Sequence, residues 1–538
     1  MTLSRREFVA LMAAGPALRL QSAAPYDLVV RGGTVFDGSG AEGRVADIAI
    51  RRGRIAAVAA GLRSRGVEEI DAKGLAVGPG FIDIHSHADG TLFDDPSAES
   101  VIRQGVTTAV IGQDGGGRLP GRDGTTTASD LFARFEALPV AVNLATMIGL
   151  GAVRRTVVGE ANRAATRAEV VRMTRLVEAA LAAGACGASA GLEYAPGAFA
   201  SRAELTALCR PLAARRLPYA PHMRNEDDTL LEAIDESVAI ARGAGCPLHL
   251  SHLKTGGARN WGKIDAVFER IASARRAGID TTFDRYPYVA WATGLTNMFP
   301  IWSQDGGVEA FLRRLDDPAT AARLKGESLE KVELVGGWHA VQISNVDAES
   351  DQDAEGKRLD DWARARRLDP YDAALVLLRN NRTNVSIVVF AMSEDNLERF
   401  LAHPKGMVCS DGGSFAESGP ARVGHPHPRG LGTFPRVLGR YVRERKALTL
   451  GQAIHKMSGM PAARLRLAGR GTIAVGAAAD LVVFDPERVA DRATFDSPFQ
   501  YPVGIPTVIV NGAVALRNGE RVGKGTGKGL RPNVRRRS

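Results

Sequence analysis

Residues 80–87 read GFIDIHSH and combine the two features that define the predicted fold, an apolar strand and a pair of histidines at its end. A short run rich in Ile and Phe that follows a Gly is typical of a buried β-strand. Because successive side chains of an extended chain point to opposite faces, His85 and His87 share one face. Two imidazoles placed side by side form half of a metal site, so this segment predicts a strand that ends at a metal centre.

The rest of the central region alternates between strand and helix patterns. Helical stretches such as RAEVVRMTRLVEAALAAGA separate most of the further strand candidates, which are GVTTAVIGQD, AVNLATMIG, GACGASAGLEY, LPYAPHMRN, CPLHLSHLK, IDTTFDRYPY and GMVCSDGG. With the first strand these make eight units, and they predict a closed parallel (β/α)8 barrel of the TIM type over residues 76–464. Residues 289–405 are too many for one connection and predict an insertion with extra helices and a lid.

Both ends of the chain have the sequence pattern of antiparallel strands. Residues 26–75 contain DLVVRGGTVFD and VADIAIRRGRIAAVA, and residues 465–520 contain GTIAVGAAADLVVFD and PTVIVNGAVALRNGERV. Apolar and polar residues alternate in these segments between Gly-rich turns. Neither short segment can bury a face alone, so they are predicted to combine into one small β-sandwich domain. The predicted fold class is therefore α/β, a barrel with a β-sandwich built from both termini.

Composition and charge exclude several classes of protein. A chain of 538 residues with 45% hydrophobic and 24% charged residues can bury a large core, which excludes a small binding module and a mostly disordered protein. The net charge of +9 lies at the ends, since residues 521–538 alone hold seven Lys and Arg and no acid. The nearly neutral body gives no reason to expect a nucleic-acid partner. Residues 521–538 are predicted to form a basic disordered tail.

Residues 1–24 predict an export signal. The pair Arg5 and Arg6 precedes an apolar run over residues 8–18, and the small residues Ser22 and Ala24 fit a cleavage site. The apolar run is too short to span a membrane. Its SRREF motif resembles the twin-arginine signal, with an ordinary secretory signal as the alternative. A periplasmic or secreted protein is therefore expected, with no membrane association after the signal is removed.

Three further strand candidates end in residues that bind metals. His222 ends the fifth, His252 the sixth and Asp411 the eighth. The C-terminal ends of barrel strands form one rim, so these side chains are expected to meet the histidine pair. Imidazole nitrogens together with a carboxylate oxygen suit Zn²⁺, with Mn²⁺ or Fe²⁺ as alternatives.

The order of these residues resembles the amidohydrolase superfamily. Longer motifs are similar to the N-acyl-D-amino-acid deacylases (D-aminoacylases), and they are GLEYAPGAFAS, HMRNEDDTLLEAIDESVAIARGAG, LSHLKTGGARNWGK, the YPY of residues 286–288 and HPHPRGLGTFPRVLGRYVRE. The likeness covers most of residues 26–520. It implies metal-dependent hydrolysis of the amide bond of N-acyl-D-amino acids, with one or two Zn²⁺ ions and a small-molecule substrate as partner.

The second strand departs from the family pattern. Family members end this strand with a Cys ligand in a Gly-Asn-Cys-Gly setting, whereas here Asp114 occupies the Cys position in Gly112-Gln113-Asp114-Gly115. A carboxylate also binds divalent metals, but it is a harder donor than a thiolate. The resemblance therefore implies that Asp114 is a ligand, and the alternative is that it only caps the following turn.

The resemblance also implies a role for each remaining site residue. Asp114, His222 and His252 would hold the tighter metal, and His85 and His87 would contribute to a second site. Asp411 would be the catalytic acid and base. The residues that would bind the substrate α-carboxylate are Lys254, Tyr286 and Arg429.

The sequence is also compatible with two other functions. Another amidohydrolase, such as a dipeptidase or a cyclic-amide hydrolase, often has a carboxylated Lys on strand four, and GACGASAGLEY contains no Lys. A non-catalytic barrel scaffold would not need the full set of ligands. The sequence carries no signal for the substrate side chain, the acyl group or the oligomeric state.

Overall fold

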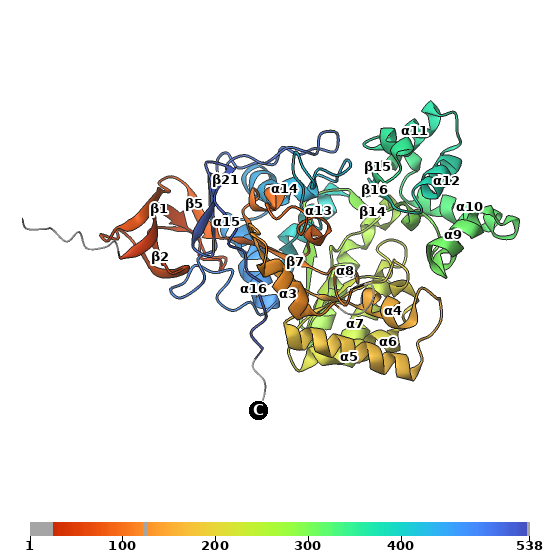
Figure 1. Cartoon of the computed structure of the whole chain (residues 1–538), viewed down its shortest axis with the longest axis horizontal. Coiled ribbons are helices and arrows are strands. Elements are labelled where there is room, and N and C mark those ends of the chain that lie inside the picture. Colours follow the sequence, from red (N-terminus) through yellow and green to blue (C-terminus); the bar gives the residue numbers. More distant parts are fainter. Residues whose placement is uncertain (1–24, 122–125, 535–538) are drawn as a thin grey trace, which may run out of the picture.

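The computed structural model describes residues 25–121 and 126–534. The export signal predicted for residues 1–24 lies outside the described residues. Figure 1 shows a β domain on the left, a barrel in the middle and a helical insertion on the right. Within the described residues, no helix is long and apolar enough to cross a membrane.

The central unit is a parallel barrel. Its strands fall into a three-stranded and a six-stranded sheet, and neighbouring strands in both are parallel. Only Met147 separates β8 from β9, so the two sheets share one continuous strand. At the other seam the Asp411 N–H donates to the His85 carbonyl over 2.9 Å and the His87 N–H to the Gly412 carbonyl over 2.9 Å. These contacts close eight strand positions into a ring, so the predicted barrel is confirmed. The strands are β6 (Phe81–Asp83), β7 (Val106–Ile111), β8 (Asn143–Thr146), β9 (Ile148–Gly149), β10 (Ala188–Gly191), β11 (Tyr219–His222), β12 (Leu248–Leu250), β13 (Thr281–Arg285) and β17 (Gly406–Val408).

Helices surround these strands, and local sequence signals set their ends. In α5 (Arg167–Ala183) the Thr166 side chain accepts from the Glu169 N–H and the Glu169 carboxylate accepts in return, which is a capping box. The helix ends where Gly184 adopts φ +114°, a conformation that favours glycine. The other helices outside the insertion are α2 (Glu99–Ile102), α3 (Ala128–Glu136), α4 (Leu150–Val158), α6 (Arg202–Ala213), α7 (Leu230–Ala244), α8 (Ile264–Arg276), α13 (Glu394–Ala402), α14 (Arg429–Arg436), α15 (Leu450–Met457) and α16 (Gly459–Arg464).

Strands from both ends of the chain form one nine-stranded sheet. They meet where β5 pairs antiparallel with β18, with Gly78 opposite Val482. Alternate residues of these strands, such as Leu28 and Val30, are buried in a separate apolar cluster. The strands are β1 (Tyr26–Val35), β2 (Arg44–Arg51), β3 (Arg54–Ala59), β4 (Gly66–Asp71), β5 (Ala76–Pro79), β18 (Leu481–Phe484), β19 (Thr507–Val510), β20 (Ala513–Arg517) and β21 (Glu520–Arg521).

The C-terminal segment differs from the predicted disordered tail. The Leu144 N–H of β8 donates to the Lys528 carbonyl over 3.0 Å, and the Leu530 N–H donates to the Leu144 carbonyl over 2.7 Å. Gly529 lies so close to the Phe132 ring that a side chain would collide with it. The prediction was wrong over the described part of the tail, because glycines let the backbone lie along a barrel strand without an apolar face of its own.

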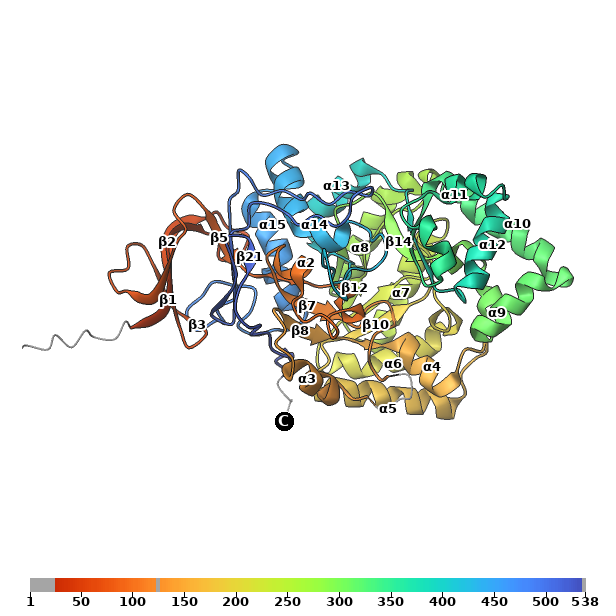
Figure 2. The same ribbon diagram turned by 45° about the horizontal axis from the view of Figure 1, so that its top comes forward.

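The insertion between β13 and β17 contains a sheet as well as the expected helices. Its strands β14 (Trp291–Gly294), β16 (Val385–Val389) and β15 (Val341–Val346) are antiparallel in that order. Buried residues such as Phe311 and Trp362 give this unit its own core. Figure 2 shows it packed at one side of the barrel. Its helices are α9 (Gly307–Asp316), α10 (Pro318–Leu334), α11 (Leu359–Ala365) and α12 (Pro370–Asn380).

Candidate metal centre and substrate cavity

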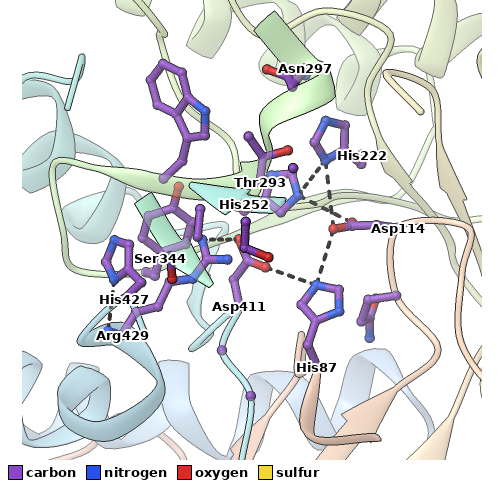
Figure 3. A pocket seen from close by; sticks show the side chains of 18 of the residues that line it. His87, Asp114, His222, His252, Thr293, Asn297, Ser344, Asp411, His427 and Arg429 are labelled. Carbon is purple, nitrogen blue, oxygen red and sulfur yellow. Dashed lines mark hydrogen bonds and ion pairs between the residues drawn. The ribbon is translucent and has the colours of Figure 1, made fainter. Parts of the chain in front are cut away.

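The four histidines predicted as metal ligands surround Asp114, and Figure 3 shows three of them, His87, His222 and His252. Asp114 Oδ1 lies 3.4 Å from His85 Nε2 and 3.3 Å from His252 Nε2. Asp114 Oδ2 lies 3.3 Å from His87 Nε2 and 3.8 Å from His222 Nδ1. The Asp114 side chain therefore stands at the centre of four imidazoles contributed by three strand ends.

A tight turn after β7 aims Asp114 at this point. Asp114 has φ +52° and Gly115 has φ +70°, so the chain reverses within two residues. The Ser189 hydroxyl of β10 donates to the Gly112 carbonyl over 2.6 Å and accepts from the Gly115 N–H over 3.0 Å. A non-glycine residue with positive φ needs support from its surroundings, and the neighbouring strand supplies it here.

Three groups of ligand atoms in the described part of the chain are close enough to hold a metal ion. Asp114 belongs to two of them, and the third joins Glu193, His222 and Glu226. One group joins Asp114 to His222 and His252, and the atoms of each group lie within 4.8 Å of one another. Asp114 would therefore contribute a ligand to either of these two sites. The members of the other group with Asp114 are His85, His87, Asp114 and Asp411.

The chemistry of the donor set fits a divalent cation. Both ring nitrogens of His85 and Oδ1 of Asp114 are buried without a hydrogen-bond partner. Burial lowers the pKa of His87, but hydrogen bonds to Asp114 and Asp411 outweigh it and raise the pKa to about 9. A site whose negative charge holds extra protons would hold a metal ion in their place.

Three outer carboxylates, to which the sequence assigns no role, orient three of the histidines. His252 Nδ1 lies 3.0 Å from Glu226 Oε1, and His222 Nε2 lies 3.4 Å from Glu193 Oε2. His85 Nδ1 lies 3.7 Å from Asp284 Oδ2. Each of these contacts leaves the other ring nitrogen facing Asp114, the arrangement that fixes ring orientation in metal sites. Asp284 could have been suspected, because it is a carboxylate near the C-terminal end of a predicted barrel strand.

Asp411 directs one carboxylate oxygen toward the histidine cluster and the other toward Arg429. Its Oδ1 lies 3.2 Å from His87 Nε2, and its Oδ2 accepts from Arg429 Nη1 over 2.7 Å. Burial would raise the pKa of the Asp411 carboxyl, but the charges of Arg429, His252 and His85 together outweigh burial and hold that pKa below its ordinary value. Asp411 is therefore ionised and able to accept a proton beside the cluster.

Lys254, Tyr286 and Arg429 line the same cavity as the cluster. Lys254 Nζ contacts the Glu226 carboxylate and lies 2.8 Å from His252 Nδ1. The Tyr286 hydroxyl is buried without a partner, and the Arg429 guanidinium lies 4.8 Å from the centre of the Tyr286 ring. Two cations and a free hydroxyl donor in one wall have the chemistry needed to hold a carboxylate.

A further cation, Arg285, supports this wall from behind. Its guanidinium lies 4.2 Å from the centre of the Tyr286 ring, and its Nη2 donates to the Tyr288 carbonyl over 2.8 Å. Its Nε and Nη1 are buried without partners, and it forms no ion pair among the described residues. Because Glu226 and Asp411 already offset Lys254 and Arg429, the charge of Arg285 leaves this wall net positive.

The cavity has a volume of about 590 Å³, and the insertion forms its roof. Barrel loops supply the floor with the histidines and Asp114. Residues of β14, β15 and β16 and the segment after β14 face it from above. These roof residues are Trp291, Thr293, Asn297, Ser344, Asn345 and Ser386. A parallel barrel with a metal-ligand cluster and a carboxylate-binding wall at its C-terminal rim defines a metal-dependent hydrolase.

Comparison with known proteins shows which family the chain resembles. A model of the amidohydrolase family matches residues 68–301 and 420–516. A D-aminoacylase of Alcaligenes xylosoxydans xylosoxydans is 36% identical over 522 residues, with 94% of this chain and 98% of the relative covered. An N-acyl-D-glutamate deacylase of the same organism is 37% identical over 505 residues, with 91% and 93% covered.

A solved structure agrees with these relatives. The crystal structure of N-acyl-D-glutamate deacylase from Bordetella bronchiseptica, in complex with zinc and a phosphonate that mimics the tetrahedral intermediate, superposes with a TM-score of 0.80. It is 34% identical and covers 94% of this chain and 99% of its own. The chain therefore belongs to the amidohydrolase family, and within it to the group of the N-acyl-D-amino-acid deacylases.

Proposed function

We propose that this protein hydrolyses the amide bond of N-acyl-D-amino acids and releases a carboxylate and a free D-amino acid. The observation that carries the proposal is that a metal-ligand cluster and a carboxylate-binding wall face one cavity. An N-acyl amino acid presents an amide next to a carboxylate, so it would engage both at once. The names of the relatives support the same chemistry.

We infer that the cluster holds one or two Zn²⁺ ions. Asp114, His222 and His252 would form one site, and His85 and His87 would join the other. A divalent ion held there supplies Lewis acidity, which lowers the pKa of water and polarises an amide carbonyl. The mixture of imidazole nitrogen and carboxylate oxygen suits Zn²⁺ and also admits other divalent metals.

The protein's own groups would move the proton and orient the substrate. Asp411 Oδ1 would accept the proton of the attacking water and then deliver it to the leaving amine nitrogen, so one carboxyl serves as base and then as acid. Lys254, Tyr286 and Arg429 would bind the α-carboxylate. With the amide and the carboxylate both fixed, only one configuration at Cα directs its side chain into the remaining space.

A chiral panel of N-acetyl amino acids tests the proposal with the metal-loaded enzyme. The D-enantiomers are expected to be hydrolysed, and each L-enantiomer is expected to react at least about 100-fold more slowly in kcat/KM. Hydrolysis of dipeptides or cyclic amides in preference to these substrates would reject the proposal.

The structure also argues against those two alternative activities, which often depend on a carboxylated Lys on the fourth strand. Gly191 of β10 packs on the Asp114 carbonyl and leaves no room for a side chain at this position.

Asp114→Cys and Asp114→Ala test the ligand that replaces the family Cys. A thiolate is a softer donor, so Asp114→Cys is expected to raise the affinity for Zn²⁺ relative to Mn²⁺. Asp114→Ala is expected to weaken Zn²⁺ binding at least about tenfold, because it removes the carboxylate shared by two of the ligand groups. Competitive titration with a zinc chelator measures both effects. Unchanged affinity in both variants would leave Asp114 as a turn residue.

We further propose that the protein is exported by the twin-arginine route to the periplasm or beyond the cell. The Arg pair and short apolar run of residues 1–24 support this. Fractionation of cells expressing the full chain, compared with a variant in which Arg5 and Arg6 are both Lys, would test it. Equal export of both chains would reject the twin-arginine route.

A further inference from the structure

The roof of the cavity combines polar residues with the apolar ring of Trp291 around the space left for a substrate side chain. Its polar lining residues are Thr293, Asn297, Ser344, Asn345 and Ser386, which carry hydroxyl and amide groups. Some of these groups have protein partners, since the Asn297 amide donates to Glu193 over 3.3 Å and the Ser344 hydroxyl donates to the His425 carbonyl over 3.0 Å. Hydroxyl oxygens and amide groups keep further donor and acceptor capacity after one hydrogen bond. The roof can therefore bind a group that both donates and accepts.

The cations of the cavity are already paired with carboxylates. Among the described residues, the Lys and Arg side chains that line it are Lys254, Lys331 and Arg429. Lys254 contacts Glu226, Arg429 contacts Asp411, and Lys331 contacts Asp227. The α-carboxylate of the substrate would use Lys254 and Arg429, so only Lys331 remains for a second anion.

Lys331 is poorly suited to a second anion. Its ammonium touches the Asp227 carboxylate, and the carboxylates of Glu193 and Glu226 also act on its charge. Glu193 itself is bound to the neutral Asn297 amide and to His222 and has no Lys or Arg partner among the described residues. An acidic side chain that reached Lys331 would therefore meet more negative charge than positive charge.

We infer that this enzyme selects N-acyl-D-amino acids with a neutral, hydrogen-bonding side chain, an amide or a hydroxyl, and rejects acidic ones. The inference rests on the proposed function and narrows it. A side-chain amide offers the roof both a donor and an acceptor. A carboxylate of the same shape offers acceptors only and brings a charge that no free cation of the cavity lining balances.

Three substrates with side chains of similar length separate the effect of charge from the effect of hydrogen bonding. N-acetyl-D-glutamine and N-acetyl-D-glutamate differ in charge but hardly in shape, and N-acetyl-D-methionine lacks strong hydrogen-bonding groups. We expect kcat/KM for D-glutamine to exceed that for D-glutamate at least about 100-fold, and that for D-methionine about 10-fold. A preference for either D-glutamate or D-methionine over D-glutamine would overturn the inference.

Asp227→Asn tests the role of Lys331 directly. Asp227 Oδ1 accepts from Asn225 Nδ2 over 2.6 Å and from the Asp228 N–H over 2.5 Å, and an amide oxygen can keep both bonds. Its Oδ2 is the atom that holds Lys331. The variant should therefore free the ammonium without unfolding the loop. The ratio of kcat/KM for D-glutamate to that for D-glutamine is expected to rise at least about 10-fold.

Asp228→Asn is the matched control. Asp228 pairs with Arg259 at the surface, and its side chain does not line the cavity. The control should leave the substrate ratio unchanged. An active Asp227→Asn enzyme with the parent ratio would overturn the inference. Failure of the parent to hydrolyse any N-acyl-D-amino acid would instead reject the proposed function.

Discussion

His252→Ala is expected to remove bound metal and amide hydrolysis together. His252 Nε2 faces Asp114 Oδ1 at 3.3 Å and His222 Nδ1 at 3.0 Å, so the substitution deletes one nitrogen from the compact group that would hold the tighter ion. It also removes the imidazole that Glu226 Oε1 contacts at 3.0 Å. Without Lewis acidity at the amide, kcat/KM should fall by at least about 10³-fold.

Metal analysis by mass spectrometry, run beside the kinetics, measures this effect. His339→Ala is a suitable control, because His339 is exposed and does not line the cavity. The control should keep the metal content and rate of the parent. A His252→Ala enzyme with full metal content and near-parent kcat would show that the cluster is not the catalytic metal site.

The inner residues of the site could be predicted because strand ends follow simple geometry. His222 ends β11, and His252 and Asp411 follow β12 and β17 within three residues. A parallel barrel brings such positions to one rim whatever the intervening helices contain. Asp114 was placed by its position in a motif, and the turn with φ +52° points its side chain at the histidines.

The outer residues could not be predicted in the same way, because their partners come from other parts of the chain. Glu226 lies in the loop after β11, yet it contacts His252 and Lys254 beyond the next strand. Arg285 looks like an ordinary strand-end cation in sequence, and only packing shows that it is buried against Tyr286. The roof depends on β15 and β16, which are short runs without a turn signal to pair them. Tertiary contacts therefore decide what local periodicity leaves open.

Glu226 also links the two halves of the proposed chemistry. Its Oε1 lies 3.0 Å from the ring of His252, and its Oε2 contacts Lys254. One carboxylate thus orients a predicted metal ligand and offsets a cation of the carboxylate-binding wall. A substrate carboxylate that approaches Lys254 would compete with Glu226 for the same ammonium. Arg285, which has no such competitor among the described residues, keeps the wall attractive to an anion.

Asp411→Asn is expected to keep the bound metal and to lower kcat by a factor of about 10² to 10⁴, the usual contribution of a positioned acid and base. The amide oxygen can still accept from Arg429, so the loop after β17 should hold its shape, but the amide nitrogen cannot take up a proton beside His87. The tighter metal should remain because its predicted ligands Asp114, His222 and His252 are untouched. Metal content and kcat, measured on the same sample, give the result.

Asp89→Asn provides a control. Asp89 is another carboxyl that lines the cavity but contacts none of the cluster atoms, so this variant should lower kcat far less. If Asp411→Asn stays within a few-fold of the parent, another group must move the proton.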